Sequence, residues 1–243
     1  MNPSKTAFIQ KIETFATVDG PGIRTLFFLA GCPLRCLYCH NPETWQSGVG
    51  ITMDVEKLVS LVKRYKPYYG ELGGVTFSGG EPLMQAEFIA HAFKRLKEEG
   101  IHTCLDTSGY NRSPFLPEIL KHTDLILYDI KAAEPSLYRT ITGQDMAVTD
   151  DFLALAQEFK VPLWIRQVVV PGLNDSFEQM NQLANKIYPL RYTEKIELLP
   201  YHTLGVTKYE KLNLNYPLKD VPAMDITRLK ELEDYLFDQL QNR

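Results

Sequence analysis

The sequence predicts an α/β fold, a partial (β/α)6 barrel in which a parallel sheet carries its helices on the outside. The first observation is a series of six short apolar runs rich in β-branched and aromatic residues, which is the pattern of buried parallel strands. The second is the helical apolar stripe that lies between most successive runs. Strand and helix patterns that alternate in this way require a parallel sheet with outer helices. Six units are too few for a closed eight-stranded barrel, so an open doubly wound sheet is the alternative.

The predicted strands cover residues 23–30, 74–77, 102–107, 125–130, 162–170 and 195–199. Helical stripes with apolar residues at i, i+3, i+4 and i+7 are Val55/Leu58/Val59/Val62, Ile89/Ala92/Phe93/Leu96, Phe152/Leu155/Ala156/Phe159 and Met180/Leu183/Ala184/Ile187. A leucine stripe predicts a last helix near 225–241, whereas residues 40–54 and 200–224 lack periodicity and predict irregular loops. We expect one domain over 1–243, with core strands and helices at about 16–199 and a loop plus helix at 200–243.

Composition excludes several classes of protein. The chain has 243 residues, of which 44% are hydrophobic and 23% charged, and its net charge is −4. No block of lysine and arginine occurs, so the electrostatic pattern of nucleic-acid binding is missing. The first residues, "MNPSKTAFIQ", do not resemble a signal peptide, and no apolar run approaches the ~20 residues of a membrane span. We predict a cytoplasmic monomer without a nucleic-acid or membrane partner.

Residues suited to chemistry follow the end of every predicted strand. A cysteine triad follows the first strand, "SGGEP" (78–82) the second, "DTSG" (106–109) the third, "DIK" (129–131) the fourth, "PG" (171–172) the fifth and "PYH" (200–202) the sixth. The carboxyl ends of parallel strands meet at one edge of the sheet, where α/β enzymes carry their catalytic groups. This convergence predicts an enzyme.

The triad, Cys32, Cys36 and Cys39, has the spacing C-x3-C-x2-C, and Cys104 stands alone. Cytosolic thiols stay reduced, so clustered cysteines indicate a metal site, and soft thiolates suit zinc or an iron–sulfur cluster. Zinc would need a fourth ligand such as His40 or Cys104, and the spacing also fits inert thiols on one helix face. We favour a cluster, because His40 adjoins Cys39 and Cys104 falls inside a strand pattern. Three thiolates would leave one iron open to a substrate or cofactor.

The stretch "CPLRCLYC" resembles the signature of the radical S-adenosylmethionine superfamily. Together with "TVDGPGIRTLFFLAGCPLRCLYCHNPETW", "SGGEPLMQAEF", "GIHTCLDTSGY" and "KIELLPYH", it makes the chain similar to the glycyl radical enzyme activases that act on pyruvate formate-lyase. The resemblance covers nearly the whole chain. Some related activases carry an inserted ferredoxin-like segment, for which this chain has neither the cysteines nor the length.

The resemblance implies a [4Fe–4S] cluster that reductively cleaves S-adenosylmethionine. The resulting 5′-deoxyadenosyl radical would take hydrogen from a glycine Cα of pyruvate formate-lyase. Nothing in the chain stores an electron otherwise, so an external one-electron reductant such as flavodoxin is implied. Three alternatives remain open: an activase of another glycyl radical enzyme, a radical enzyme acting on a small molecule, and a zinc-stabilised interaction module without catalysis.

The resemblance also implies which residues form the site. Those expected to bind S-adenosylmethionine are Tyr38, Cys39, His40, Gly79, Gly80, Glu81, Asp129, Ile130, Lys131, Arg166 and His202. A monovalent cation would be held by Asp106, Thr107 and Asp129, while Asp19 and the irregular segments 40–54 and 200–224 would meet the partner's glycine loop. The residues alone add that Asp129 and Lys131 leave a strand on the same face. They also add that Arg166 needs an acidic partner, either a bound carboxylate or a helix acid.

Overall fold

The computed structural model describes residues 6–242, and these contain one eight-stranded sheet of order β3-β1-β2-β4-β5-β6-β7-β8. The six neighbours from β2 to β8 run parallel, which confirms the predicted α/β fold with six parallel strands. The strands are β1 Thr6–Ala16, β2 Arg24–Leu29, β3 Ile51–Asp54, β4 Gly74–Gly79, β5 His102–Thr107, β6 Leu125–Asp129, β7 Leu163–Val169 and β8 Thr193–Pro200.

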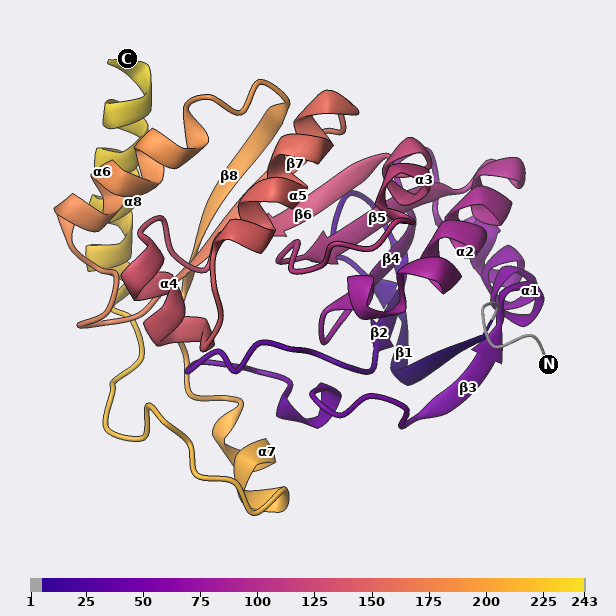
Figure 1. The fold of residues 1–243 in the computed structure, drawn as a ribbon, viewed down its shortest axis with the longest axis horizontal. Coiled ribbons are helices and arrows are strands. Elements are labelled where there is room, and N and C mark those ends of the chain that lie inside the picture. The colour runs from indigo at the N-terminus through magenta and orange to yellow at the C-terminus, as the bar shows by residue number, and fades with distance from the viewer. Residues whose placement is uncertain (1–5, 243) are drawn as a thin grey trace.

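Helices α1 to α6 lie in the connections between successive strands and α7 and α8 follow β8, and Figure 1 shows most of the helices along the outer side of the sheet. They are α1 Val55–Tyr65, α2 Ala86–Glu98, α3 Leu116–Lys121, α4 Pro135–Thr142, α5 Ala147–Glu158, α6 Phe177–Ile187, α7 Val206–Lys211 and α8 Ile226–Gln241, with 3-10 turns η2 Pro42–Thr44, η3 Lys66–Tyr68 and η4 Pro82–Gln85. Local signals set their starts: Asp54, Ser176 and Asp225 accept N-terminal backbone N–H groups of α1, α6 and α8. In the described chain, no helix has the length and apolarity that a membrane span requires.

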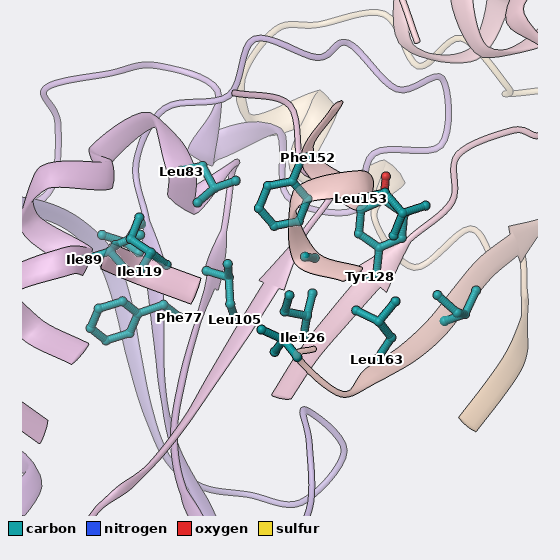
Figure 2. Close-up of a cluster of buried hydrophobic side chains, with 14 of the residues drawn as sticks. Phe77, Leu83, Ile89, Leu105, Ile119, Ile126, Tyr128, Phe152, Leu153 and Leu163 are labelled. Carbon is teal, nitrogen blue, oxygen red and sulfur yellow. The ribbon is translucent and has the colours of Figure 1, made fainter. Parts of the chain in front are cut away.

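Alternation along each strand divides the side chains between two environments. In β6, Ile126 and Tyr128 pack into the core beneath the helices, whereas Leu127 belongs to a separate cluster with Cys104 on the inner side of the sheet. Figure 2 shows Phe152 of α5 lying near Tyr128, and the two rings stack with centroids 6.1 Å apart. The outer positions therefore build the core, and the inner positions are left for the site.

Two strands were not predicted, and they extend the sheet beyond the predicted core. β1 pairs antiparallel with β2, and β3 pairs antiparallel with β1, so the sheet begins at Thr6 rather than near residue 16. The irregular segment 40–54 contains η2 and β3, and segment 200–224 contains α7. These elements were not predicted because they are short or because, like β1, they are only partly buried and mix apolar with charged residues.

The amino-terminal end of the parallel strands is held by Arg24, whose side chain is fully buried. Its Nε donates to Thr76 Oγ1 (2.6 Å), and its Nη2 donates to the Val75 carbonyl (2.7 Å) and lies 3.1 Å from His102 Nδ1. Because guanidinium only donates, Nδ1 must accept and His102 is neutral here. Burial and the Arg24 charge lower the pKa of His102 to about 4.

This arrangement predicts acid sensitivity of the fold. The unfolded chain protonates His102 near its ordinary pKa of 6.5, but the folded chain resists protonation down to about 4. The unfolded state therefore binds more protons in this window, and the free energy of unfolding falls as pH drops from 6.5 to 4. We expect a loss of about 1–2 kcal/mol, reduced by the partial exposure of the ring. Urea titrations of wild type and His102→Asn should show a flatter pH profile for the variant; equal slopes would contradict this account.

Candidate active site

The three cysteines of the triad lie on an irregular loop, residues 31–41, called here the cysteine loop. No helix forms there, which removes the interpretation of thiols on a helix face. Backbone bonds fix the loop: Arg35 N donates to Thr142 O at the end of α4 (2.9 Å), Leu37 N to Ile141 O (2.9 Å), and Cys39 N to Cys36 O (3.0 Å). Backbone hydrogen bonds to α4 and within the loop therefore contribute to its shape.

All three thiols line one cavity of about 330 Å³ at the carboxyl ends of the parallel strands. Burial raises the pKa of Cys32 to about 12 and that of Cys36 to about 11, and it also raises the pKa of Cys39. Near Cys36 the Lys131 ammonium works in the opposite direction. A soft metal that takes these thiols as thiolates must release their protons.

The zinc interpretation loses one of its two candidate fourth ligands, because only His40 lines the cavity. Cys104 is fully buried in β5 against Leu125 and Leu127 and is not among the residues that line the cavity. Across residues 6–242, no three side chains of His, Cys, Asp or Glu converge to hold a single metal ion. A cubane makes a different demand, because each thiolate ligates its own iron and the sulfurs need not meet at one point.

Four charged residues at the carboxyl ends of β5, β6 and β7 also line the cavity, and we call them the ion network: Asp106, Asp129, Lys131 and Arg166. Arg166 Nη2 contacts Asp106 Oδ1, and Arg166 Nε donates to Asp129 Oδ1 (3.0 Å). Lys131 Nζ donates to Asp129 Oδ2 (2.9 Å). Arg166 is thus paired with strand acids, not with the helix acid considered from the sequence. The same register that pairs Asp129 with Arg166 across β6 and β7 brings them together.

Charge pairing decides the protonation of this network. Burial pushes the pKa of Asp129 upward, but Arg166 and Lys131 outweigh it and the net pKa is lowered. At Asp106, burial dominates over the Arg166 charge and the pKa is raised. Burial alone would lower the pKa of Lys131, yet Asp129, Tyr38 and Cys36 raise it well above its ordinary value. Lys131 and Asp129 therefore both carry charge at neutral pH.

The carboxylate of Glu81 is fully engaged in hydrogen bonds within the chain. Its side chain is 1% exposed, and its carboxylate accepts from Thr107 Oγ1, from Ser108 Oγ (2.6 Å) and N (3.0 Å), and from Leu83 N (3.1 Å). It thereby ties the end of β4 to the end of β5. Thr107 Oγ1 also accepts from Gly109 N (2.8 Å), so this hydroxyl, expected to ligate a cation, is engaged within the chain.

The two glycines before Glu81 are needed for contacts within the chain. Gly79 has φ +113°, and a Cβ there would lie 2.4 Å from Leu29 N. A Cβ on Gly80 would lie 2.3 Å from Gly31 O. Both glycines line the cavity, but the space they leave is filled by β2 and the start of the cysteine loop. The backbone of Gly79 and Gly80 thus packs directly against β2 and the start of the cysteine loop, which leaves no room for a side chain.

The remaining predicted contacts divide into those on the cavity and those off it. Tyr38, His40 and His202 line it, and the two histidine rings meet edge to face at 5.0 Å. Ile130 does not: its side chain is 2% exposed and belongs to the core beneath the helices. Asp19 also lies off the cavity wall, where its carbonyl accepts from Thr76 Oγ1 (2.7 Å).

An excursion of the chain, residues 202–223, covers one side of the cavity. It leaves β8 after Tyr201 and returns to the same residue, because Met224 N donates to Tyr201 O (2.9 Å). Its helix α7 stands apart from the other helices in Figure 1, on the side of the segment that follows β2. Lys208 Nζ bonds Asn41 Oδ1 (2.7 Å) and Glu43 Oε1 (2.8 Å), joining the excursion to that segment.

Sequence reasoning missed several residues of the cavity. Ser78 Oγ donates to Asp106 Oδ2 (2.7 Å), and Ser108 holds Glu81; both lie within motifs that were recognised, "SGGEP" and "DTSG". Trp45 and Tyr201 also line the cavity. Tyr201 belongs to the recognised "PYH" and to a segment that was expected to meet the partner's glycine loop, whereas Trp45 lies in a loop that no strand-end rule marks.

The residues present fit a cluster with a zwitterionic ligand. Three soft thiols line the cavity together with a cation and carboxylates that lie within bonding distance of each other. Lys131 has three N–H donors, and one of them donates to Asp129. Tyr38 Oη, in the described structure, is buried without a hydrogen-bond partner. The cavity wall thus retains polar groups that a ligand can satisfy.

The fold and the cysteine loop agree with the comparison against family models. The model of the Radical SAM superfamily matches residues 26–184, from β2 to α6. The chain belongs to this superfamily.

Relatives place it within the superfamily. A pyruvate formate-lyase-activating enzyme from Clostridium pasteurianum is 52% identical over 96% of this chain and 98% of its own length. A solved domain of the pyruvate-formate lyase-activating enzyme from Bacteroides vulgatus has a TM-score of 0.57 at 26% identity, covering 69% of this chain and 94% of that one. Streptococcus suis SuiB, solved with its precursor peptide SuiA, shares the fold (TM-score 0.69, 17% identity, 90% of this chain and 46% of that one). The chain belongs to the pyruvate formate-lyase-activating enzyme family.

Proposed function

We propose that this chain is an oxidoreductase that activates pyruvate formate-lyase by generating a glycyl radical on it. Cys32, Cys36 and Cys39 would hold a [4Fe–4S] cluster, which would supply the electron for reductive cleavage of S-adenosylmethionine to a 5′-deoxyadenosyl radical. Hydrogen would then be taken from a glycine Cα of the partner. The observation that carries the proposal is that the three thiols and the ion network line the same cavity. A relative at 52% identity with this activity in its name supports it.

The ion network is suited to bind the cofactor. The two unused N–H groups of Lys131 can donate to a carboxylate, and each oxygen of Asp129 retains a lone pair for a ribose hydroxyl or an ammonium group. Tyr38 and His40 come from the cysteine loop and His202 from the excursion, so these three side chains reach the ligand from a second direction. Gly79, Gly80, Glu81 and Ile130 contribute through their backbone, because the Glu81 carboxylate is occupied and the Ile130 side chain faces the core.

A monovalent cation is part of the proposal as a ligand of Asp106, Asp129 and the Thr107 carbonyl. Support comes from the two carboxylates, which both contact Arg166 and so lie side by side. Hard oxygen ligands of this kind suit alkali cations. The Thr107 hydroxyl is excluded from this set because it bonds Glu81 and Gly109.

The partners follow from the same chemistry. Asp19 is proposed to meet the glycine loop of pyruvate formate-lyase, because it lies near Asp106 and Arg166 of the ion network. Burial raises the pKa of Asp19, the Asp106 charge raises it further, and the Arg166 charge lowers it. A low-potential one-electron donor such as flavodoxin reduces the cluster. We propose that the chain works as a cytoplasmic monomer. Within segment 200–224, Tyr201 and Tyr209 are buried and hold the excursion in place.

The test is anaerobic. The reconstituted protein is incubated with reductant, S-adenosylmethionine and pyruvate formate-lyase, and electron paramagnetic resonance is used to detect a glycyl radical. The expected result is a radical doublet on pyruvate formate-lyase that requires all components. Formation of 5′-deoxyadenosine with no radical on this partner, but with one on another glycyl radical enzyme, would overturn the partner assignment.

Lys131→Ala separates cofactor binding from cluster binding. We expect iron content to be unchanged, and the affinity for S-adenosylmethionine to fall by about tenfold to a hundredfold, because a charge-assisted bond is lost. Isothermal calorimetry on the reconstituted protein measures it. Lys186→Ala is the matched control, since Lys186 is equally shielded (15% against 14% exposed) and paired with Asp150, away from the cavity. Equal affinities of the two variants would remove Lys131 from the site.

A further inference from the structure

The excursion, residues 202–223, is held over the cavity by a short stretch of chain around α7. The start of α7 packs on His40, because a Cβ added to Gly205 would lie 3.0 Å from His40 Cδ2. Four residues further on, Tyr209 Oη donates to the Cys39 carbonyl (3.2 Å). Among the helices and strands, α7 packs mainly against η2, and Figure 1 shows it away from the sheet and the outer helices. The position of α7 therefore depends on its contacts with residues 39–44.

The return limb of the excursion is anchored elsewhere. Tyr216 Oη donates to Tyr201 Oη (2.9 Å), and Tyr201 Oη donates to the Leu218 carbonyl (3.4 Å), so this limb is bound to the end of β8. Residues 211–215, which join α7 to the return limb, are all exposed. Segments with few buried contacts open locally at a small cost in free energy. Helix α7 can therefore move away from the cavity while β8 and the return limb stay in place.

Lys208 supplies the ionic part of the contact between α7 and the segment after β2, which we call the latch. Its Nζ lies 2.7 Å from Asn41 Oδ1 and 2.8 Å from Glu43 Oε1. In the described structure Glu43 Oε2 is buried without a hydrogen-bond partner, so the charge of this carboxylate depends on Lys208. The Lys208 and Glu43 side chains are 33% and 39% exposed. An ion pair exposed to this degree is weak, so the latch can open as well as close.

We propose that the excursion is a lid over the cavity and that Lys208 is the positioning residue that closes it, by bridging Asn41 and Glu43. The proposal rests on the proposed function, since the ligand that passes the lid is S-adenosylmethionine. His202 and Gly205 of the excursion line the cavity, whereas Lys208 and Glu43 do not. The latch thus acts on access to the cavity without touching the ligand.

A lid of this kind has a kinetic signature. It must open both for entry and for release of the ligand, so a weaker latch raises the association and the dissociation rate constants by the same factor. The Kd, which is their ratio, then stays unchanged. A side chain that contacts the ligand would instead raise the dissociation rate constant and the Kd together.

The test compares Lys208→Met with Lys97→Met in reconstituted protein whose cluster is oxidised. Lys97 is similarly exposed (37%) and pairs with Asp124, which precedes β6 at the opposite end of the strands. Rapid filtration with labelled S-adenosylmethionine measures association and, after a chase with unlabelled compound, dissociation. We expect both rate constants to rise about fivefold in Lys208→Met, the effect of losing a partly exposed ion pair, with a Kd within about twofold of wild type. Lys97→Met should match wild type. An increase confined to dissociation, or no change in either rate constant, would overturn the lid.

Charge reversal gives a second measurement that needs no cofactor. Lys208→Glu places a carboxylate against Glu43, and the addition of Glu43→Lys restores an opposite pair, to which the Asn41 amide can donate. In cluster-free protein, hydrogen exchange of the α7 amides should be faster in the single variant and return to the wild-type rate in the double variant. Equal exchange in wild type and single variant, or no recovery in the double variant, would overturn the latch. Failure of the wild-type protein to bind S-adenosylmethionine would instead overturn the proposed function and leave the exchange result intact, so the two failures are distinguishable.

Discussion

Replacing Cys36 by alanine is expected to remove the cluster and all activity. The three thiols of the cysteine loop line one cavity, and among the described residues no further cysteine reaches it, because Cys104 is buried in β5. Two thiolates do not replace the three that this site provides for a cubane. Iron and acid-labile sulfide assays on anaerobically reconstituted protein should fall from about four per chain to near zero.

Cys104→Ala is the matched control. Cys104 packs against Leu125 and Leu127 on the inner side of the sheet, so the variant should lose about 1 kcal/mol of stability, as is usual for a small core substitution. It should retain full iron and activity. Loss of iron from Cys104→Ala, or a full cluster in Cys36→Ala, would contradict the assignment of the ligands.

Asp129→Ala is expected to cause the second largest effect, on stability as well as on cofactor binding. Asp129 is 24% exposed and accepts from both Arg166 and Lys131, which are 12% and 14% exposed. Its removal leaves Lys131 without its carboxylate and Arg166 with Asp106 alone. We expect the free energy of unfolding of the apoprotein to fall by about 3 kcal/mol, the lower end for a buried ion pair that loses one partner.

Asp151→Ala provides the comparison for this loss. Asp151 pairs with Arg112 on the surface, where both side chains are about 60% exposed, so the variant should lose less than about 1 kcal/mol. Urea denaturation of both apoproteins measures the difference. If Asp129→Ala lowers the free energy of unfolding no more than Asp151→Ala does, the ion network does not stabilise the fold, and this account of it is contradicted.

The parallel strands could be predicted because strands buried on both faces are almost continuously apolar. β6, read as residues 125–130, is found at Leu125–Asp129. β1 could not be predicted in the same way. Its residues include Gln10, Lys11 and Glu13, and most of the strand is only partly buried, so the apolar signal is diluted. Pairing with β2, which is set by tertiary contacts, makes it a strand.

The site was predictable as a set of positions, because carboxyl ends of parallel strands meet at one edge. Which of these side chains form ion pairs and hydrogen bonds with each other was not predictable. The register sets Arg166 directly opposite Asp129, while Asp106 lies opposite Leu127, so Arg166 reaches Asp106 diagonally across β6. This register is invisible in the sequence. Glu81 likewise lies in the expected motif, but its carboxylate accepts hydrogen bonds from Ser108 and Thr107. These bonds depend on how the loops after β4 and β5 pack, which the sequence does not show.

The most direct measurement of the central claim is Mössbauer spectroscopy of the protein reconstituted with ⁵⁷Fe, before and after addition of S-adenosylmethionine. A cubane with three cysteine ligands has one iron that the protein does not ligate, and this iron alone should change its spectrum when the sulfonium compound binds. A spectrum without a cubane, or one in which every iron is unaffected by the addition, would contradict the account.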